Sequence, residues 1–176
     1  MIAQLAGTLL EKHVQRLVVD VGGVGYDVQV PLSTFYAVGE PGARVTLRVH
    51  THVREDALQL FGFVTALELS LFQRLISVSG IGPKVALAVL SGIEPADLIR
   101  AVKGSDIARL TRIPGVGKKT SERIVVELKD RLPTVEEPAA SDAVSDAGDV
   151  RDYVISAPVN LGYQRGSVER VVDTVL

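Results

Sequence analysis

The chain has 176 residues, of which 47% are hydrophobic and 23% charged, and its formal net charge is -2 at pH 7. That length is enough for one medium-sized domain or for two or three small ones, each with its own core. Cysteine is absent, which excludes a disulfide scaffold, a cysteine zinc site and a thiol nucleophile. Because no signal-peptide pattern is evident and no apolar run approaches about 20 residues, we expect a soluble cytoplasmic protein without membrane contact.

Charge is distributed unevenly along the chain. Residues 1–64 have a net charge of -1, residues 65–134 carry eleven basic and seven acidic side chains, and residues 135–176 have a net charge of -5. A basic middle segment beside an acidic C-terminal one predicts an anionic partner for the middle segment alone.

Residues 1–64 are expected to form β-structure. Runs rich in β-branched residues at 15–21 and 26–30 flank a glycine-rich turn, which is typical of a hairpin. From 45 to 54 apolar and polar side chains alternate, which predicts a strand with one buried face; Glu55 and Asp56 interrupt it before a further strand. About five short strands in so few residues favour a small β-barrel.

Residues 65–133 are expected to form a helical domain. Thr65 and Glu68 have the spacing of a capping box, which places the first helix start at Thr65. Apolar residues then recur at helical spacing. Further helices are predicted at 85–90, 95–102, 105–110 and 119–132.

The rest of the chain divides into two segments. Residues 134–149 contain acids, small residues and proline but no base, and we expect a flexible acidic linker. Residues 150–176 are expected to form a small helical domain, although Pro158 interrupts its first helix. Its final helix has an apolar face and stops unfinished, so either the chain is truncated at Leu176 or this segment docks on something else.

A repeat with an offset of 35 residues occupies the helical domain. Residues 75–89 align with residues 110–124. The identical pairs are Leu75 and Leu110, Gly80 and Gly115, Gly82 and Gly117, and Lys84 and Lys119. Each copy predicts a helix, a Gly-aliphatic-Gly turn, a lysine and a second helix.

This pattern of residues suits phosphate binding. Glycine permits positive φ and close backbone approach, the exposed N–H groups of the next helix favour an anion, and the lysine adds a positive charge. Such a turn holds a phosphate without contacting a base, so binding is independent of sequence. The predicted DNA-phosphate-binding residues are Gly80, Gly82, Lys84, Gly115, Gly117, Lys118, Lys119 and Arg123.

Other chemistries fit the sequence less well. The spacing of a P-loop fails because Arg112 stands where its first glycine is needed, and the dinucleotide-binding glycine pattern fails at Val28. His50 and His52 share a strand face without a third ligand nearby, so we expect exposed histidines and no metal site. No catalytic residues and no cofactor are predicted.

The chain resembles the RuvA family, the Holliday-junction-binding subunits of bacterial branch-migration complexes. The resemblance rests on residues 22–26, 53–56, 60–63 and 161–163 together with the two hairpins, and it covers nearly the whole sequence. It implies an α+β multidomain protein with an N-terminal OB-fold β-barrel, a domain with two helix-hairpin-helix motifs, and a small C-terminal UBA-like helical domain.

The resemblance also implies partners and further site residues. RuvA-like proteins form homotetramers or octamers that hold a four-way junction open and flat. They recruit the hexameric ATPase RuvB and leave cleavage of the junction to the resolvase RuvC. These proteins act in DNA recombination, DNA repair and the SOS response. Glu55 and Asp56 would form the family's acidic pin near the junction centre, with Arg54 beside it either neutralising the pin or contacting a phosphate. The motor-binding residues would be Leu161, Gly162, Tyr163, Val168, Val171 and Val172.

Two other classes of function remain as alternatives to a non-catalytic junction-binding subunit. A helix-hairpin-helix glycosylase would place a Gly-Val-Asp after the hairpin, and a nuclease would need clustered carboxylates; neither feature is found in the sequence. A protein-only adaptor would use the hairpins merely to pack helices.

Overall fold

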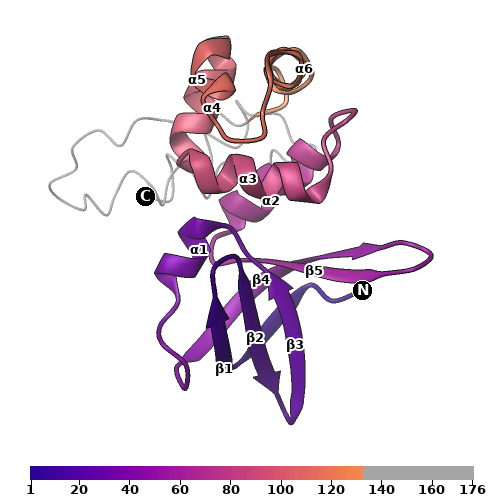
Figure 1. Cartoon of the computed structure of the whole chain (residues 1–176), viewed down its shortest axis with the longest axis vertical. Helices are drawn as coiled ribbons and strands as arrows, with labels where there is room; N and C mark the ends of the chain where they lie inside the picture. Colours follow the sequence, from indigo (N-terminus) through magenta and orange to yellow (C-terminus); the bar gives the residue numbers. More distant parts are fainter. Residues whose placement is uncertain (133–176) are drawn as a thin grey trace, which may run out of the picture. The chain divides into compact units, whose positions relative to one another are not determined.

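The computed structural model describes residues 1–132, and its first part is a closed barrel of five strands (Figure 1). The strands are β1 (Gln4–His13), β2 (Arg16–Val21), β3 (Val24–Gln29), β4 (Arg44–Val53) and β5 (Leu58–Phe63). Their order around the barrel is β1-β2-β3-β5-β4, and only the β3–β5 pair is parallel. A short helix, α1 (Leu32–Ala37), connects β3 to β4. The expected barrel is confirmed, whereas α1 was not predicted.

The long strand β1 closes the barrel by pairing with two neighbours. Its first half pairs with β4 and its second half with β2, and a bulge between Leu9 and Glu11 bends it. Gly7 lies at the crossover, where a Cβ atom would stand 1.9 Å from the carbonyl oxygen of Asp20. Only glycine allows the two strands to approach this closely.

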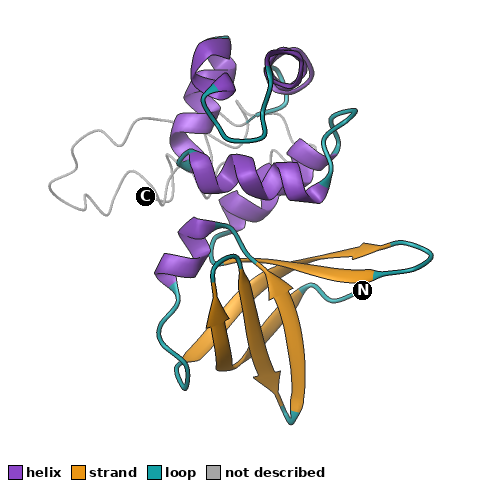
Figure 2. Cartoon of the chain, in the orientation of Figure 1, coloured by secondary structure: helices purple, strands orange, loops and turns teal. Residues whose placement is uncertain are grey.

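The β4–β5 hairpin continues beyond the body of the barrel (Figure 2). Val45, Leu47 and Val49 are buried, as the alternation predicts. The pattern then stops producing burial, because Val53 and its cross-strand partner Leu58 are 67% and 63% exposed. The alternation of apolar and polar side chains therefore continues beyond the residues that pack into the barrel core.

The second part is helical. Its helices are α2 (Ala66–Ile76), α3 (Pro83–Gly92), α4 (Pro95–Lys103), α5 (Ile107–Thr111) and α6 (Lys118–Leu128). The capping box at Thr65 and Glu68 is confirmed, with both reciprocal hydrogen bonds present. The helix expected to continue to Leu132 ends at Leu128, with Lys129 as its C-cap, and the N–H of Arg131 then bonds the Leu128 carbonyl at the three-residue spacing of a tighter turn.

The helical core extends onto the barrel through β5. Phe61 and Phe63 of β5 are fully buried, and their ring centroids lie 5.1 and 5.0 Å from that of Phe72 in α2. Glu68 adds a polar link, since its buried carboxylate caps α2 and accepts a hydrogen bond of 2.5 Å from Ser33 of α1. Barrel and helices are thus packed together on one strand.

The predicted linker at 134–149, the UBA-like domain, Pro158 and the motor-binding residues 161–172 lie outside the described residues. In residues 1–132, no helix has the length and apolar character needed to cross a membrane.

The expectation that His50 and His52 are exposed is wrong, because both are half-buried and His50 packs against the helical core, and His50 gives a prediction about stability and pH. Its ring packs 5.4 Å from Phe72, and burial, followed by the nearby charge of His52, lowers the pKa of His50 below its ordinary 6.5. Because the unfolded chain accepts this proton more readily than the folded one, the free energy of unfolding should decrease as pH falls through 6.5. Urea unfolding at pH 7.5 and pH 5 should show a smaller decrease for His50→Gln than for the unchanged protein.

The control is Leu10→Gln, which changes an exposed side chain of β1 without altering a titratable group. It should keep the pH dependence of the unchanged protein. An unaltered pH dependence in His50→Gln would contradict the assignment.

Candidate nucleic-acid interface

The turn between α2 and α3 has the geometry that the repeat predicts. Gly80 adopts φ +83°, a conformation open to few residues besides glycine. Ile81 is only 5% exposed and packs into the helical core, and its N–H donates to the Val78 carbonyl at 3.1 Å. Gly82 then forms the N-cap of α3 with φ -87° and ψ 170°. The buried aliphatic side chain thereby holds the two glycines at the surface.

The turn between α5 and α6 repeats this geometry closely (Figure 2). Gly115 adopts φ +82°, Val116 is 4% exposed, and its N–H donates to the Ile113 carbonyl at 3.0 Å. Gly117 forms the N-cap of α6 with φ -85° and ψ 171°. The two helix-hairpin-helix motifs are therefore confirmed as structural repeats.

Both second helices begin without a side-chain cap. Neither Gly82 nor Gly117 supplies a capping hydrogen bond, in contrast to Thr65 at the start of α2. The first N–H groups of an α-helix have no partner within the helix, and the helix dipole makes this end attractive to anions. An oxyanion at either turn would satisfy these donors.

The fold itself does not require glycine at both N-caps. At Gly82 and Gly117 the φ value is ordinary, and an added Cβ would meet no atom within 4 Å. A larger side chain would therefore fit the protein but would occupy the space directly outside the turn. Glycine at these positions favours close approach of a ligand to the backbone.

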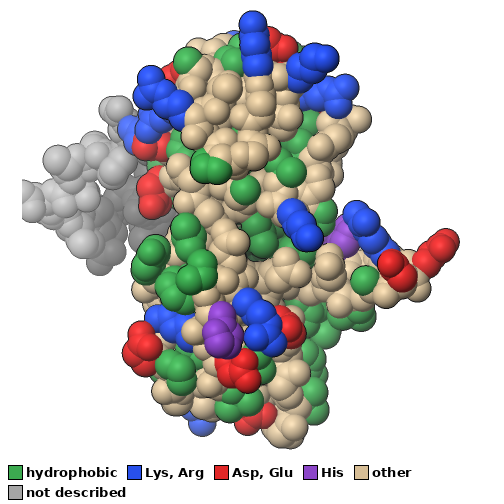
Figure 3. All heavy atoms as spheres, viewed as in Figure 1, with side chains coloured by type: hydrophobic (Ala, Val, Ile, Leu, Met, Phe, Trp, Pro, Cys, Tyr) green, Lys and Arg blue, Asp and Glu red, His purple; other side chains and the backbone are tan. Residues whose placement is uncertain are grey.

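The predicted lysines add unneutralised charge. Lys84, Lys118 and Lys119 are exposed, and within residues 1–132 none of them forms an ion pair. Figure 3 shows Lys and Arg side chains spread over the helical part. Each turn thus combines free backbone donors with mobile positive charge.

The two turns are linked directly through Arg123. This residue of α6 donates from Nη1 to the Ser79 carbonyl of the first turn at 3.1 Å. The structure therefore brings the two motifs together and leaves the glycines at 80, 115 and 117 exposed. Phosphate binding by the eight predicted residues stays a prediction.

Barrel residues also lie beside the first turn. Lys84 and Leu87 of α3 line a cleft with Gln15, Arg16, Asp27 and Gln29 of the barrel. A hydrogen bond of 2.8 Å to Asp27 and the charge of that carboxylate raise the pKa of Arg16. No local pattern in the sequence indicates these neighbours of Lys84, because only the tertiary fold brings them to α3.

A second missed neighbour is Arg112, which precedes the second turn. It lines a cleft with Glu94, Asp97 and Arg109, where Asp97 forms ion pairs with both Arg109 and Arg100. The offset of 35 residues places Arg112 opposite Ser77, so comparing unequal positions of the repeat would have found it.

The hairpin end carries the predicted acidic pin residues. Glu55 and Asp56 are exposed, and no ion pair involving either is found in the described part of the chain. Arg54 closes the turn through its N–H to the Ala57 carbonyl, and its Nε donates to His52 Nε2 at 3.1 Å. The acidic side chains at the outer end of the hairpin are visible in Figure 3.

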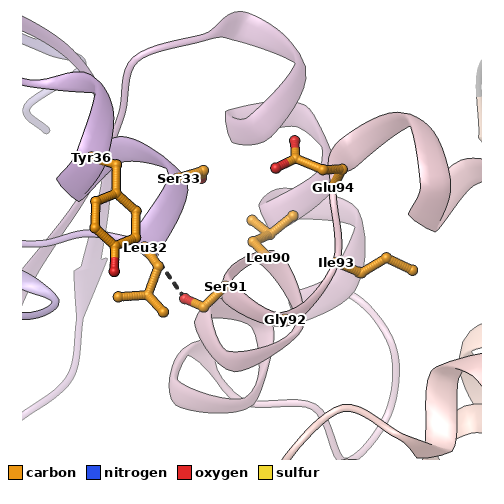
Figure 4. Close-up of a pocket in the computed structure, with 8 residues that line it drawn as sticks. All are labelled: Leu32, Ser33, Tyr36, Leu90, Ser91, Gly92, Ile93 and Glu94. Atoms are coloured by element: carbon orange, nitrogen blue, oxygen red, sulfur yellow. Dashed lines mark hydrogen bonds between the residues drawn. The ribbon is translucent and has the colours of Figure 1, made fainter.

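Another cleft lies between α1 and the end of α3 (Figure 4). Leu32 N–H donates to Ser91 Oγ at 3.1 Å, and Tyr36 and Glu94 lie at its edges. This bond joins the barrel to the helices, which is a structural role. Among residues 1–132, no group of three His, Cys, Asp or Glu side chains could hold a metal ion.

Comparisons with known proteins agree with this geometry. Residues 1–62 match the model of the RuvA N terminal domain, and residues 72–130 match that of the SAM-like helix-hairpin-helix tandem. The chain is 49% identical to a protein of Solibacter usitatus over 98% of this chain and 88% of that protein. It is 48% identical to one of Acidobacterium capsulatum, over 100% of this chain and 89% of the relative. Both are named "Holliday junction branch migration complex subunit RuvA".

The different conformations of the two glycines in a turn lead to a prediction. Gly115→Ala should lower the free energy of unfolding by about 1–2 kcal/mol, because alanine is strained at φ +82°. Gly117→Ala should lower it by less than about 1 kcal/mol, since its conformation is ordinary and the space is open. Urea unfolding of both variants measures the difference. Equal losses of stability would show that the fold needs both glycines alike.

Proposed function

Because the chain belongs to the RuvA family, we propose that it binds four-way DNA junctions in an open planar form, independent of sequence, and recruits the RuvB ATPase that drives branch migration. It acts as a non-catalytic DNA-binding subunit in recombination and repair. The observation that carries the proposal is the pair of congruent turns, with Gly80 at φ +83° and Gly115 at φ +82°, linked by Arg123.

The chemistry of these turns explains binding without sequence preference. A phosphate oxygen at the start of α3 or α6 accepts hydrogen bonds from free backbone N–H groups while a lysine approaches from the side. Every nucleotide carries the same phosphate, so these contacts position DNA without selecting a base. Two linked turns engage two phosphates of one duplex.

Preference for a junction over a plain duplex comes from assembly. Four copies around a four-fold axis present eight turns to four arms, which matches the approximate symmetry of an open junction. The exposed pair Val53 and Leu58 supports contact of the hairpin with another protein surface, because apolar side chains next to each other favour burial. An octamer would place a second tetramer on the other face of the junction.

Glu55 and Asp56 act as the acidic pin in this assembly. Four hairpin ends near one axis concentrate negative charge where the DNA strands exchange, and repulsion from phosphates keeps the arms apart. The same repulsion disfavours continuous duplex at the centre. Arg54 is held by His52 and lies next to the pin.

The remaining partners follow from the family. RuvB docks on the C-terminal segment through residues 161–163 and the apolar positions Val168, Val171 and Val172, and the resolvase RuvC acts on the same junction. The domain limits are 1–64 for the barrel, 65–133 for the helical domain, 134–149 for the linker and 150–176 for the motor-binding domain. Because the proposed ligand is the chromosomal DNA of a bacterium, we expect the protein in the cytoplasm.

Reversing the lysine charges tests the phosphate contacts. The triple variant Lys84→Glu, Lys118→Glu and Lys119→Glu should bind a labelled four-way junction at least about 100-fold more weakly, because three attractive charges become repulsive. The slope of log K against log salt should become shallower by about 0.9 for each phosphate that is no longer neutralised. Fluorescence anisotropy at several salt concentrations measures both quantities.

A matched pair on α6 provides the control. Lys119→Glu at its start should weaken binding strongly, whereas Lys129→Glu after its end makes the same charge change away from the turns. Unchanged affinity in the triple variant would favour an adaptor whose hairpins only pack helices. Cleavage of the junction in the presence of magnesium by the unchanged protein would favour the nuclease alternative.

Neutralising the pin should change selectivity. The double variant Glu55→Gln and Asp56→Asn removes two negative charges per chain from the proposed centre, so affinity for linear duplex should increase by about tenfold while junction affinity changes less. Titrating both DNAs with the same protein measures the ratio. Asp130→Asn, which removes an exposed acid near the end of α6, should leave the ratio unchanged. An equal increase for both DNAs would contradict the role of the pin.

A further inference from the structure

Arg123 has no equivalent arginine in the first copy of the repeat. The offset of 35 residues pairs Lys119 with Lys84, but it pairs Arg123 with Ala88. If Arg123 served only as one more phosphate contact of its own turn, the first turn would lack an equivalent. The contacts of this side chain point instead to a connection between the turns.

The guanidinium of Arg123 lies against the backbone of the first turn. Its Nη1 donates to the Ser79 carbonyl at 3.1 Å, and a Cβ added at Gly80 would stand 3.0 Å from the same nitrogen. Ser79 immediately precedes the glycine with positive φ. A side chain of α6 thus contacts the first turn where its backbone reverses direction.

The position of Arg123 along α6 determines which parts of the two motifs this bond connects. Residue 123 lies six positions after Gly117, which is about 9 Å along a helix axis. Arg123 lies in the middle of α6, so the bond ties this helix, and with it the second turn at the helix start, to the first turn. A similar bond acts near the other end of α6, where Arg74 of α2 donates to the Arg131 carbonyl. Two arginine-to-carbonyl bonds thereby fix α6 against the first motif.

From these contacts we infer that Arg123 is a positioning residue that sets the spacing between the two phosphate-binding turns. The inference rests on the proposed function, since spacing matters only if both turns engage one duplex. Two binding elements held at the correct separation reach their second phosphate without a further loss of conformational freedom. A first turn released from α6 would have to be ordered again at each binding event.

The test compares Arg123→Ala and Arg123→Lys with the control Lys129→Ala. Lys129 also donates a hydrogen bond between elements, to Ser105 Oγ at 3.0 Å, but at the opposite end of α6. We expect both Arg123 variants to bind a four-way junction about tenfold more weakly, because lysine keeps the charge but is one bond shorter and lacks the guanidinium. Lys129→Ala should bind within about twofold of the unchanged protein.

Hydrogen exchange without DNA provides the second measurement. The Ile81 N–H is bonded within the first turn and the Val116 N–H is bonded equivalently within the second. Arg123→Ala should accelerate exchange at Ile81 severalfold and leave Val116 unchanged. If Arg123→Lys binds as tightly as the unchanged protein, or if Ile81 exchange does not change in Arg123→Ala, the inference is wrong.

The glycines offer an independent check. Gly80→Ala and Gly115→Ala introduce the same positive-φ strain, but only the first places a methyl group on the Arg123 guanidinium. Gly80→Ala should therefore weaken junction binding more than Gly115→Ala, and the difference should vanish in the Arg123→Ala background. A difference that persists there would contradict the inference. If the unchanged protein binds no junction at all, the proposed function fails, while the Ile81 exchange still decides whether Arg123 holds the first turn.

Discussion

The candidate interface depends on one buried aliphatic side chain in each turn. Ile81 and Val116 are almost fully removed from solvent, and each such burial contributes roughly 1.5–3 kcal/mol. Because the middle residue is buried in the core, the glycines on either side remain outside and the next helix begins facing solvent. Without this packing, free N–H groups and lysines would be present in the sequence but would not converge on a single position.

A second packing contact makes the barrel part of the same compact unit as the turns. β5 contributes its inner face to the barrel core and its outer residues Phe61 and Phe63 to the helical core. The buried carboxylate of Glu68 completes the helix cap and reaches Ser33 of α1. A buried carboxylate needs such partners, and here it connects two elements as well as capping one. The same strand, β5, forms one side of the hairpin that carries Glu55 and Asp56.

Sequence patterns predicted the features of the structure that depend on residues close together in the sequence. The capping box at Thr65 and the repeat at 80–84 and 115–119 depend on neighbouring residues, so both could be found without a structure. The helix α1 was missed because it has only six residues and no capping side chain. Exposure at Val53 was missed because periodicity shows which face is apolar but not where the core ends. The barrel neighbours of Lys84 come from tertiary packing, which one sequence without aligned relatives cannot show.

The two turns share their geometry but differ in their donors and charge. Pro83 opens α3 and has no N–H, so the first turn offers fewer backbone donors than the second, which opens with Lys118. Arg112 likewise stands where the first motif has Ser77. The two copies therefore share the φ and ψ values of the turn, while the additional basic side chains Arg112 and Lys118 stand in the second copy. The positioning role that we propose for Arg123 agrees with this difference, because a turn with fewer donors would gain most from being held in place.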